Sequence, residues 1–189
     1  IMKRMQASRT MVFVNTKREA DHVADVLNAN GIGAAAISGD VPQPKRLKML
    51  KNFQEGSLPV LVATDVASRG LHVPDVSHVV NYDLPQDPED YVHRIGRTAR
   101  AGASGDSISF ACESYAVTLP EIEAYIGHRI PVGQMDPGLL VEVTVPPREW
   151  RPRFGGRGGG GGGGRGRPGG GSGGGGNRGR HRPGRSGRG

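Results

Sequence analysis

Hydrophobic and polar positions follow two different periods along the first two thirds of the chain. Short apolar runs predict five β-strands, at residues 10–14, 32–37, 59–63, 76–81 and 107–112. Between them, apolar residues recur at helical spacing and predict helices between Thr16 and Gly31, between Val41 and Gly56, and over 114–126. A further helix is predicted from Asp87 onward, with Asp87 as the capping acid and Pro88 at the first helical position. This alternation favours an α/β fold, a parallel β-sheet with helices on both faces.

Two of these helices can be described in more detail. Thr16 and Glu19 have capping-box spacing, in which Thr16 caps the first helix and the Glu19 side chain reaches back to it. On the second helix, Leu47, Leu50 and Phe53 recur on one face. We therefore expect this face to pack on the sheet.

Polar residues follow four of the predicted strands, at Thr16, at 38–40, at 64–65 and at 82–83. Ligands bind at the carboxyl ends of the strands in such sheets, so these four loops predict a functional edge. Each loop alone also has a purely structural interpretation, because the threonines suit helix caps and the glycine–aspartate pair suits a turn. Their convergence on one edge is the stronger signal.

Glycine and charge are distributed unevenly. The segment 151–189 consists almost entirely of Gly, Arg and Pro, and it holds 10 of the 25 basic residues and none of the 18 acidic residues. Residues 1–150 therefore have 15 basic and 18 acidic residues, a net charge of −3. A uniformly basic nucleic-acid-binding domain is excluded, and a basic arm on a mildly acidic body remains.

The Gly/Arg-rich segment cannot bury a core, so we expect it to be disordered. Arginine stacks on bases as well as pairing with phosphates, so the exclusive use of arginine favours an RNA-binding arm, with an inert linker as the alternative. We expect three parts: a folded domain at 1–130, a linker at 131–150 and a disordered RNA-binding tail at 151–189.

The single cysteine excludes an intrachain disulfide. Cys112 ends an apolar run, which predicts a thiol buried in the core. No apolar stretch approaches the length of a membrane span and no secretory signal is visible, so we expect a cytoplasmic protein or a piece of one.

Residues 93–100, His-Arg-Ile-Gly-Arg-Thr-Ala-Arg, combine three arginines and a histidine in two helical turns. Arg97 and Arg100 are three apart, so on a helix they would project from one face and could clamp a polyanion. On spacing alone, a solvated basic helix end paired with nearby acids is the alternative.

Five sequence elements together resemble the second RecA-like domain of DEAD-box RNA helicases, from residue 10 to about 126. In chain order they are Val-Phe-Val-Asn-Thr-Lys at 12–17, the Gly…Gln-x-x-Arg element at 39–46, Ala-Thr-Asp-Val-Ala-Ser-Arg-Gly-Leu at 63–71, Val-Asn-Tyr-Asp-Leu-Pro at 80–85, and residues 93–100. Finer details resemble one bacterial branch of this family. Two residues depart from the family pattern, since Ala99 replaces a glycine and His72 replaces the aspartate that holds the ATP ribose.

The resemblance implies a role for each matching residue. The arginine fingers that reach the γ-phosphate of ATP would be Arg97 and Arg100, and the nucleotide would also be lined by Gly70 and His72. The RNA sugar-phosphate backbone would be held by Thr16, Gly39, Arg46 and Thr64. Links between the motifs and to the partner domain would come from Asp65, Asp83, His93 and Arg94.

The sequence contains neither a G-x-x-x-x-G-K-[ST] phosphate loop nor an Asp-Glu-Ala-Asp element. The resemblance implies that these, together with the Mg²⁺ site, belong to an N-terminal RecA-like domain. We therefore expect half of an ATP-dependent RNA helicase of RNA turnover, with no metal site of its own and no activity alone. The alternative is a non-catalytic docking and RNA-binding module of a degradation complex of the ribonuclease E type.

Overall fold

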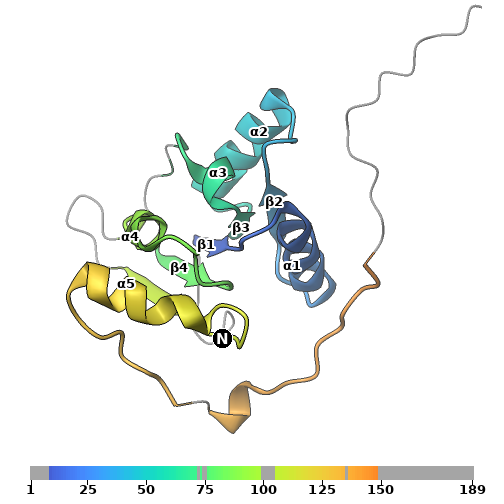
Figure 1. The fold of residues 1–189 in the computed structure, drawn as a ribbon. Helices are drawn as coiled ribbons and strands as arrows, with labels where there is room; N and C mark the ends of the chain where they lie inside the picture. Colours follow the sequence, from blue (N-terminus) through green and yellow to red (C-terminus); the bar gives the residue numbers. More distant parts are fainter. Residues whose placement is uncertain (1–8, 72, 74–75, 99–104, 135, 149–189) are drawn as a thin grey trace, which may run out of the picture. The chain divides into compact units, whose positions relative to one another are not determined.

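The computed structural model describes residues 9–71, 73, 76–98, 105–134 and 136–148 (Figure 1). The strands of the sheet are β1 (Thr10–Phe13), β2 (Ala34–Ile37), β3 (Val60–Ala63), β4 (His78–Asn81) and β5 (Asp106–Ser109). The α-helices are α1 (Lys17–Ala29), α2 (Gln43–Gln54), α3 (Asp65–Ser68), α4 (Pro88–Ile95) and α5 (Leu119–Ile126). Short 3₁₀ turns, η2 (Ala116–Thr118) and η3 (Pro137–Leu139), complete the described elements.

The five strands form one sheet in the order β2-β3-β1-β4-β5, and every neighbouring pair is parallel. On one face, α1 packs against β1, β2 and β3 through Val23, Ala24 and their neighbours. On the other face, Met49 and Phe53 of α2 pack with Phe13 and other strand residues. The predicted α/β class, with helices on both faces of a parallel sheet, is therefore confirmed.

Helix starts agree with the capping residues that the sequence indicates. Thr16 caps α1, since its Oγ1 accepts a hydrogen bond from the Glu19 N–H at 3.1 Å. The Glu19 carboxylate pairs with Arg148, 3.5 Å away. Asp87 caps α4 by accepting from the Glu89 N–H at 2.9 Å. Within the described residues, no helix is both long enough and apolar enough to span a bilayer.

The predicted inward face of α2 is partly wrong. Phe53 is fully buried and Leu50 packs at the edge of the core, but Leu47 is 57% exposed. Met49 takes the inward position instead and is 8% exposed. The helix rests on the sheet by its C-terminal half, so the apolar residue nearest its start faces solvent.

The prediction that Cys112 is a core thiol is also wrong, because this cysteine is exposed. The apolar run that contains it belongs to β5, an edge strand that ends at Ser109. Strand β5 has a neighbour on one side only, and Phe110 just beyond it is 40% exposed. An apolar run at a sheet edge therefore does not imply burial.

The inward face of α2 gives a direct test of this packing. We expect Phe53→Ala to lower the free energy of unfolding by about 3–5 kcal/mol, because it leaves a cavity in the core. Leu47→Ala on the same helix should change it by less than about 0.5 kcal/mol, because the side chain is exposed. Urea denaturation followed by circular dichroism measures both values, and equal losses would contradict the packing of α2.

Candidate functional site

Arg94 is buried at the carboxyl ends of the strands and is only 1% exposed. Its Nε and Nη2 donate to the two carboxylate oxygens of Asp65, both at 2.7 Å. Its Nη1 donates to the Asp83 carbonyl at 2.6 Å, and its Nη2 also donates to Asn15 Oδ1 at 2.9 Å. The guanidinium therefore joins the segments that follow β1, β3 and β4.

This network matches what a buried charge requires. A guanidinium removed from water is stable only when a counter-charge and hydrogen-bond acceptors replace the lost hydration. The two-point contact with Asp65 supplies the charge in the geometry that arginine favours. The ring of Phe13 lies 5.2 Å from the Arg94 guanidinium carbon and closes the apolar side.

Two further contacts fix the loops around Arg94. The Asp83 carboxylate accepts from the Asn15 N–H at 2.9 Å, and the Asn15 side-chain amide donates to the Leu84 carbonyl at 2.8 Å. The ends of β1 and β4 are thus tied together by a carboxylate and an amide that sequence analysis did not pair. The sequence could have indicated this link through Asn15, because this residue lies within the first of the five sequence elements.

Arg97 lies beyond helix α4, which ends at Ile95 with Gly96 as its C-cap. The prediction that the arginine motif continues the helix, with Arg97 on a helical face, is therefore wrong. The Arg97 side chain instead reaches back to the turn after α3, where its guanidinium donates to the Leu71 carbonyl at 2.8 Å and the Ser68 carbonyl at 3.1 Å. Arg100 lies outside the described residues, as does His72.

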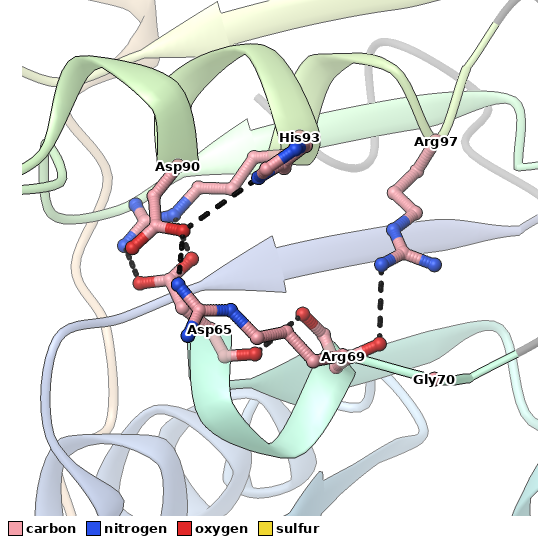
Figure 2. Close-up of a pocket in the computed structure, with 8 residues that line it drawn as sticks. Asp65, Arg69, Gly70, Asp90, His93 and Arg97 are labelled. Carbon is pink, nitrogen blue, oxygen red and sulfur yellow. Dashed lines mark hydrogen bonds and ion pairs between the residues drawn. The ribbon is translucent and has the colours of Figure 1, made fainter.

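A pocket of about 240 Å³ opens between α3 and α4 (Figure 2). Its walls come from the α3 turn and from α4, and Arg97 lies at one end of the labelled group in Figure 2. The lining residues carry three arginines, two aspartates and a histidine: Asp65, Ser68, Arg69, Gly70, Asp90, His93, Arg94 and Arg97. With histidine neutral, the lining has one net positive charge.

Asp90 forms a small charged cluster on the wall of this pocket. Arg69 Nη2 lies 2.7 Å from Asp90 Oδ1, and the His93 ring lies 3.8 Å from the same carboxylate (Figure 2). The hydrogen bond and charge of Asp90 raise the pKa of the Arg69 guanidinium. Neither Arg69 nor Asp90 was singled out from the sequence, although Arg69 lies within the third sequence element.

Gly70 turns the chain between α3 and the pocket. Its φ of +75° is in the left-handed region, which residues with a Cβ rarely adopt. An added Cβ would meet no atom within 4 Å. The backbone angle, not crowding, therefore explains the glycine at this position.

The predicted RNA-contact residues form a second group, over the ends of β1, β2 and β3. Thr16 is exposed, and Lys17 beside it pairs with Asp40 at 2.9 Å, which joins the loops after β1 and β2. Arg46 on α2 donates to the Ser38 carbonyl at 2.9 Å in the loop that contains Gly39. Thr64 is buried, with 6% of its surface exposed.

The hydroxyl of Thr64 acts as the N-cap of α3. Its Oγ1 accepts from the Ala67 N–H at 3.4 Å. Thr64 is therefore a helix cap, as its structural interpretation predicted, and so is Thr16. Lys17 is the charged residue of this group that sequence analysis did not single out, although it lies within the first of the five sequence elements.

The structure therefore places the predicted residues in two groups. The pocket group contains Asp65, Gly70, His93, Arg94 and Arg97. The strand-end group contains Thr16, Gly39, Arg46 and Thr64, which the pocket does not include. Asp83 lies between these groups, because Arg94 of the pocket donates to its backbone while its carboxylate holds the loop after β1.

The buried ion pair should dominate the stability of this site. We expect Arg94→Ala to lower the free energy of unfolding by about 3–5 kcal/mol, because it leaves the Asp65 carboxylate without its counter-charge. Arg69→Ala breaks a pair whose arginine side chain is 65% exposed, so the loss should be below about 1 kcal/mol. Urea denaturation of both variants checks this, and a small loss for Arg94→Ala would contradict the role of the network.

Comparison with known proteins identifies the family. The helicase conserved C-terminal domain model matches residues 1–102. The chain is 58% identical to the ATP-dependent RNA helicase RhlB of Histophilus somni (strain 2336) over 150 residues, which cover 79% of this chain and 36% of that protein. The chain thus spans about a third of the length of the curated relatives it matches.

Solved structures agree in fold. The Escherichia coli DEAD-box protein SrmB, bound to regulator of ribonuclease activity A, has 42% identity and a TM-score of 0.65, over 68% of this chain and 76% of that chain. Saccharomyces cerevisiae Dbp5 bound to RNA and ADP BeF3 has 37% identity and a TM-score of 0.61, over 67% of this chain and 35% of that chain. This chain belongs to the helicase conserved C-terminal domain family and is the C-terminal RecA-like domain of a DEAD-box RNA helicase similar to RhlB.

Proposed function

We propose that this domain supplies the arginine-finger half of an ATP-dependent RNA helicase and part of the site that holds the RNA backbone. The observation that carries this proposal is the position of Arg97. Its guanidinium is fixed by two carbonyl oxygens at a pocket whose lining has a net positive charge. Such an arginine can stabilise the charge that develops on a transferred phosphoryl group.

The pocket suits one side of a nucleotide site. A net positive charge attracts an anion, and Gly70 lets the backbone turn at the pocket edge. Arg97 would face the γ-phosphate of ATP, together with Arg100 from the segment outside the described residues. The remaining phosphate contacts and Mg²⁺ would come from the phosphate-loop domain, and these groups would meet the pocket when the two domains close.

The strand-end group suits the sugar-phosphate backbone of RNA. Thr16 and Lys17 lie beside the Gly39 turn, where exposed hydroxyl, ammonium and backbone N–H groups can bind phosphates without reading bases. The structural relative Dbp5 is bound to RNA and ADP BeF3, which supports the proposal that a helicase containing this domain binds both ligands. We therefore expect binding that does not depend on RNA sequence.

Arg94 would couple the two sites. It holds Asn15, which immediately precedes Thr16, and Asp65, which immediately follows Thr64. It also lies on the last turn of α4, from which the chain continues to Arg97. An RNA strand that shifts the loops after β1 and β3 would therefore also shift the arginine finger, so that hydrolysis would depend on RNA.

Docking on another protein is the second candidate, and it has less support. The relative SrmB is bound to regulator of ribonuclease activity A, and this complex supports the proposal of a protein partner. On α5, Tyr125 is 59% exposed and would belong to such a surface. A partner of the ribonuclease E type stays a proposal on these grounds.

The finger assignment predicts a large effect on turnover. In the whole helicase, Arg97→Ala should lower RNA-stimulated ATP hydrolysis by roughly 10²-fold or more, because charge stabilisation in the transition state is lost. ATP affinity should change much less, since the finger acts mainly on the transition state. The matched control is Lys51→Ala, whose side chain is 72% exposed on α2.

Hydrolysis kinetics at saturating RNA, with ATP binding measured separately, test this assignment. Turnover of Arg97→Ala equal to that of Lys51→Ala would show that Arg97 is not a finger. The chain of residues 1–189 alone should show no RNA-stimulated hydrolysis, because its sequence has no phosphate loop.

A second prediction concerns the Gly/Arg-rich segment. It carries 10 arginines, whereas residues 1–150 carry a net charge of −3. Each RNA phosphate that the segment neutralises should add about −0.7 to the slope of log affinity against log salt concentration. Removing residues 151–189 should therefore weaken RNA binding and flatten its salt dependence.

Fluorescence anisotropy with a single-stranded RNA at several salt concentrations measures both effects. A variant with all 10 arginines replaced by lysine is the control, since it keeps the charge but loses stacking on bases. It should retain much of the slope and lose affinity. Equal affinity and slope for the shortened chain would mean that the segment is only a linker.

A further inference from the structure

The chain after α5 returns to α1 and is held there at two points. The side-chain amide of Asn30 donates to the Thr144 carbonyl at 2.8 Å, and its oxygen accepts from the Thr144 N–H at 2.9 Å. Four residues later, Arg148 pairs with Glu19 at 3.5 Å. We call residues 144–148 the C-terminal strap.

The positions of these two contacts along α1 show in which direction the strap runs. Glu19 is in the first turn of α1 and Asn30 is its C-cap, and eleven helical residues rise about 16 Å. Residues 144–148 cover about 13 Å when extended, and Pro146 and Pro147 favour an extended backbone. The strap therefore runs antiparallel to α1 and ends near the start of this helix.

The start of α1 lies at the strand-end edge of the sheet, because the helix follows β1 after a short loop. Arg148, the last described residue of the strap, pairs with Glu19 and therefore lies at this edge.

An exposed aromatic surface lies at the same edge, on the sheet face that carries α1. Val80 belongs to the core cluster under α1, and its register partner Ile108 must point to the same face. By the same alternation, Tyr82 and Phe110 follow on this face one residue beyond β4 and β5. Both continue the ladder, since the Tyr82 N–H donates to the Phe13 carbonyl and the Phe110 N–H to the Asn81 carbonyl, each at 2.9 Å.

This surface is not covered by the described helices. Helix α1 packs over β1, β2 and β3, whereas Tyr82 is 43% exposed and Phe110 is 40% exposed. Ile108 is half-buried, and Cys112 beside them is exposed. We call Tyr82, Ile108 and Phe110 the aromatic face.

The strap ends close to the aromatic face. Partial burial raises the pKa of the Tyr82 phenol, and the carboxylates of Glu19 and Asp83 raise it further. The positive charge of Arg148 acts in the opposite direction on the same phenol. The backbone places Tyr82 near the start of α1, because its N–H donates to the carbonyl of Phe13, the last residue of β1, and α1 starts four residues later.

We propose that Trp150, two residues beyond the strap, docks on the aromatic face formed by Tyr82, Ile108 and Phe110. Two extended residues reach at most about 7 Å from Arg148, whose partner Glu19 lies in the first turn of α1. Trp150 is the single tryptophan of a chain with only 5% aromatic residues. Packing of the Trp150 ring against the rings of Tyr82 and Phe110 would remove apolar surface from water on both sides.

Docking would extend the folded domain past residue 148 and fix the start of the arginine-rich segment at the strand-end edge. Arg151 and Arg153 flank the docked residue in the sequence. They would then lie on the side of the sheet where Thr16 and Lys17 are exposed. The inference about Trp150 does not depend on RNA binding, and it can fail while the proposed function holds.

The chain provides a single tryptophan and a single cysteine, which allows a direct proximity test. A bimane fluorophore on Cys112 is quenched by a tryptophan in contact with it. In the full chain we expect strong quenching of bimane-labelled Cys112, and recovery of the emission in Trp150→Phe. Emission that is the same in both chains would overturn the proposal.

Solvent protection of Trp150 gives an independent test. Acrylamide should quench its fluorescence several-fold less in the folded chain than in urea. Tyr82→Ala and Phe110→Ala should restore quenching, whereas Tyr125→Ala, which removes an exposed tyrosine from α5, should not. Circular dichroism verifies that each variant is folded.

Two outcomes contradict the proposal. Full quenching in the wild-type chain would mean that Trp150 is in solvent and that the aromatic face is open to another partner. Protection that survives both Tyr82→Ala and Phe110→Ala would mean that Trp150 docks elsewhere.

Discussion

A buried guanidinium sets the conditions under which this domain can fold. Arg94 must satisfy its charge and its N–H groups inside the protein, and the partners it finds come from separate parts of the chain. Asp65 lies at the start of α3, Asn15 follows β1, and the Asp83 carbonyl follows β4. The loops at the strand ends are therefore not independent, because each one contributes an acceptor that the same buried group needs.

Under the proposed function, this shared requirement would allow one edge to serve two ligands. The pocket side carries Arg97 on the chain that leaves α4, and the strand-end side carries Thr16 and the exposed Lys17. A rigid connection through Arg94 lets a displacement on one side reach the other without a hinge. Coupling of this kind requires two arrangements of the network, and closure on a phosphate-loop domain would supply the second arrangement.

The outer strands show a different constraint. The central strands β1 and β3 are buried on both faces, so their residues are apolar in unbroken runs. Strand β5 has one neighbour and is mostly exposed, and the face beyond it carries Tyr82 and Phe110 without a helix over them in the described part of the chain. The strap, which returns from far along the sequence, is held by Glu19 of α1 and by its C-cap Asn30, and this helix covers the neighbouring strands.

The strands, the helix caps at Thr16 and Asp87, and the family could all be predicted from the sequence, because periodicity, capping and motif order depend on residues close together in the chain. The residues that line the pocket were predicted in part for the same reason. The exposure of Leu47 and Cys112 and the position of Arg97 beyond the helix could not be predicted in this way, since they depend on which elements lie opposite in the fold. Helix α4 ends at Ile95, and Arg97 then reaches carbonyls more than twenty residues away in the sequence. A local sequence pattern cannot predict such a contact, because the fold of the sheet places these distant carbonyls next to Arg97.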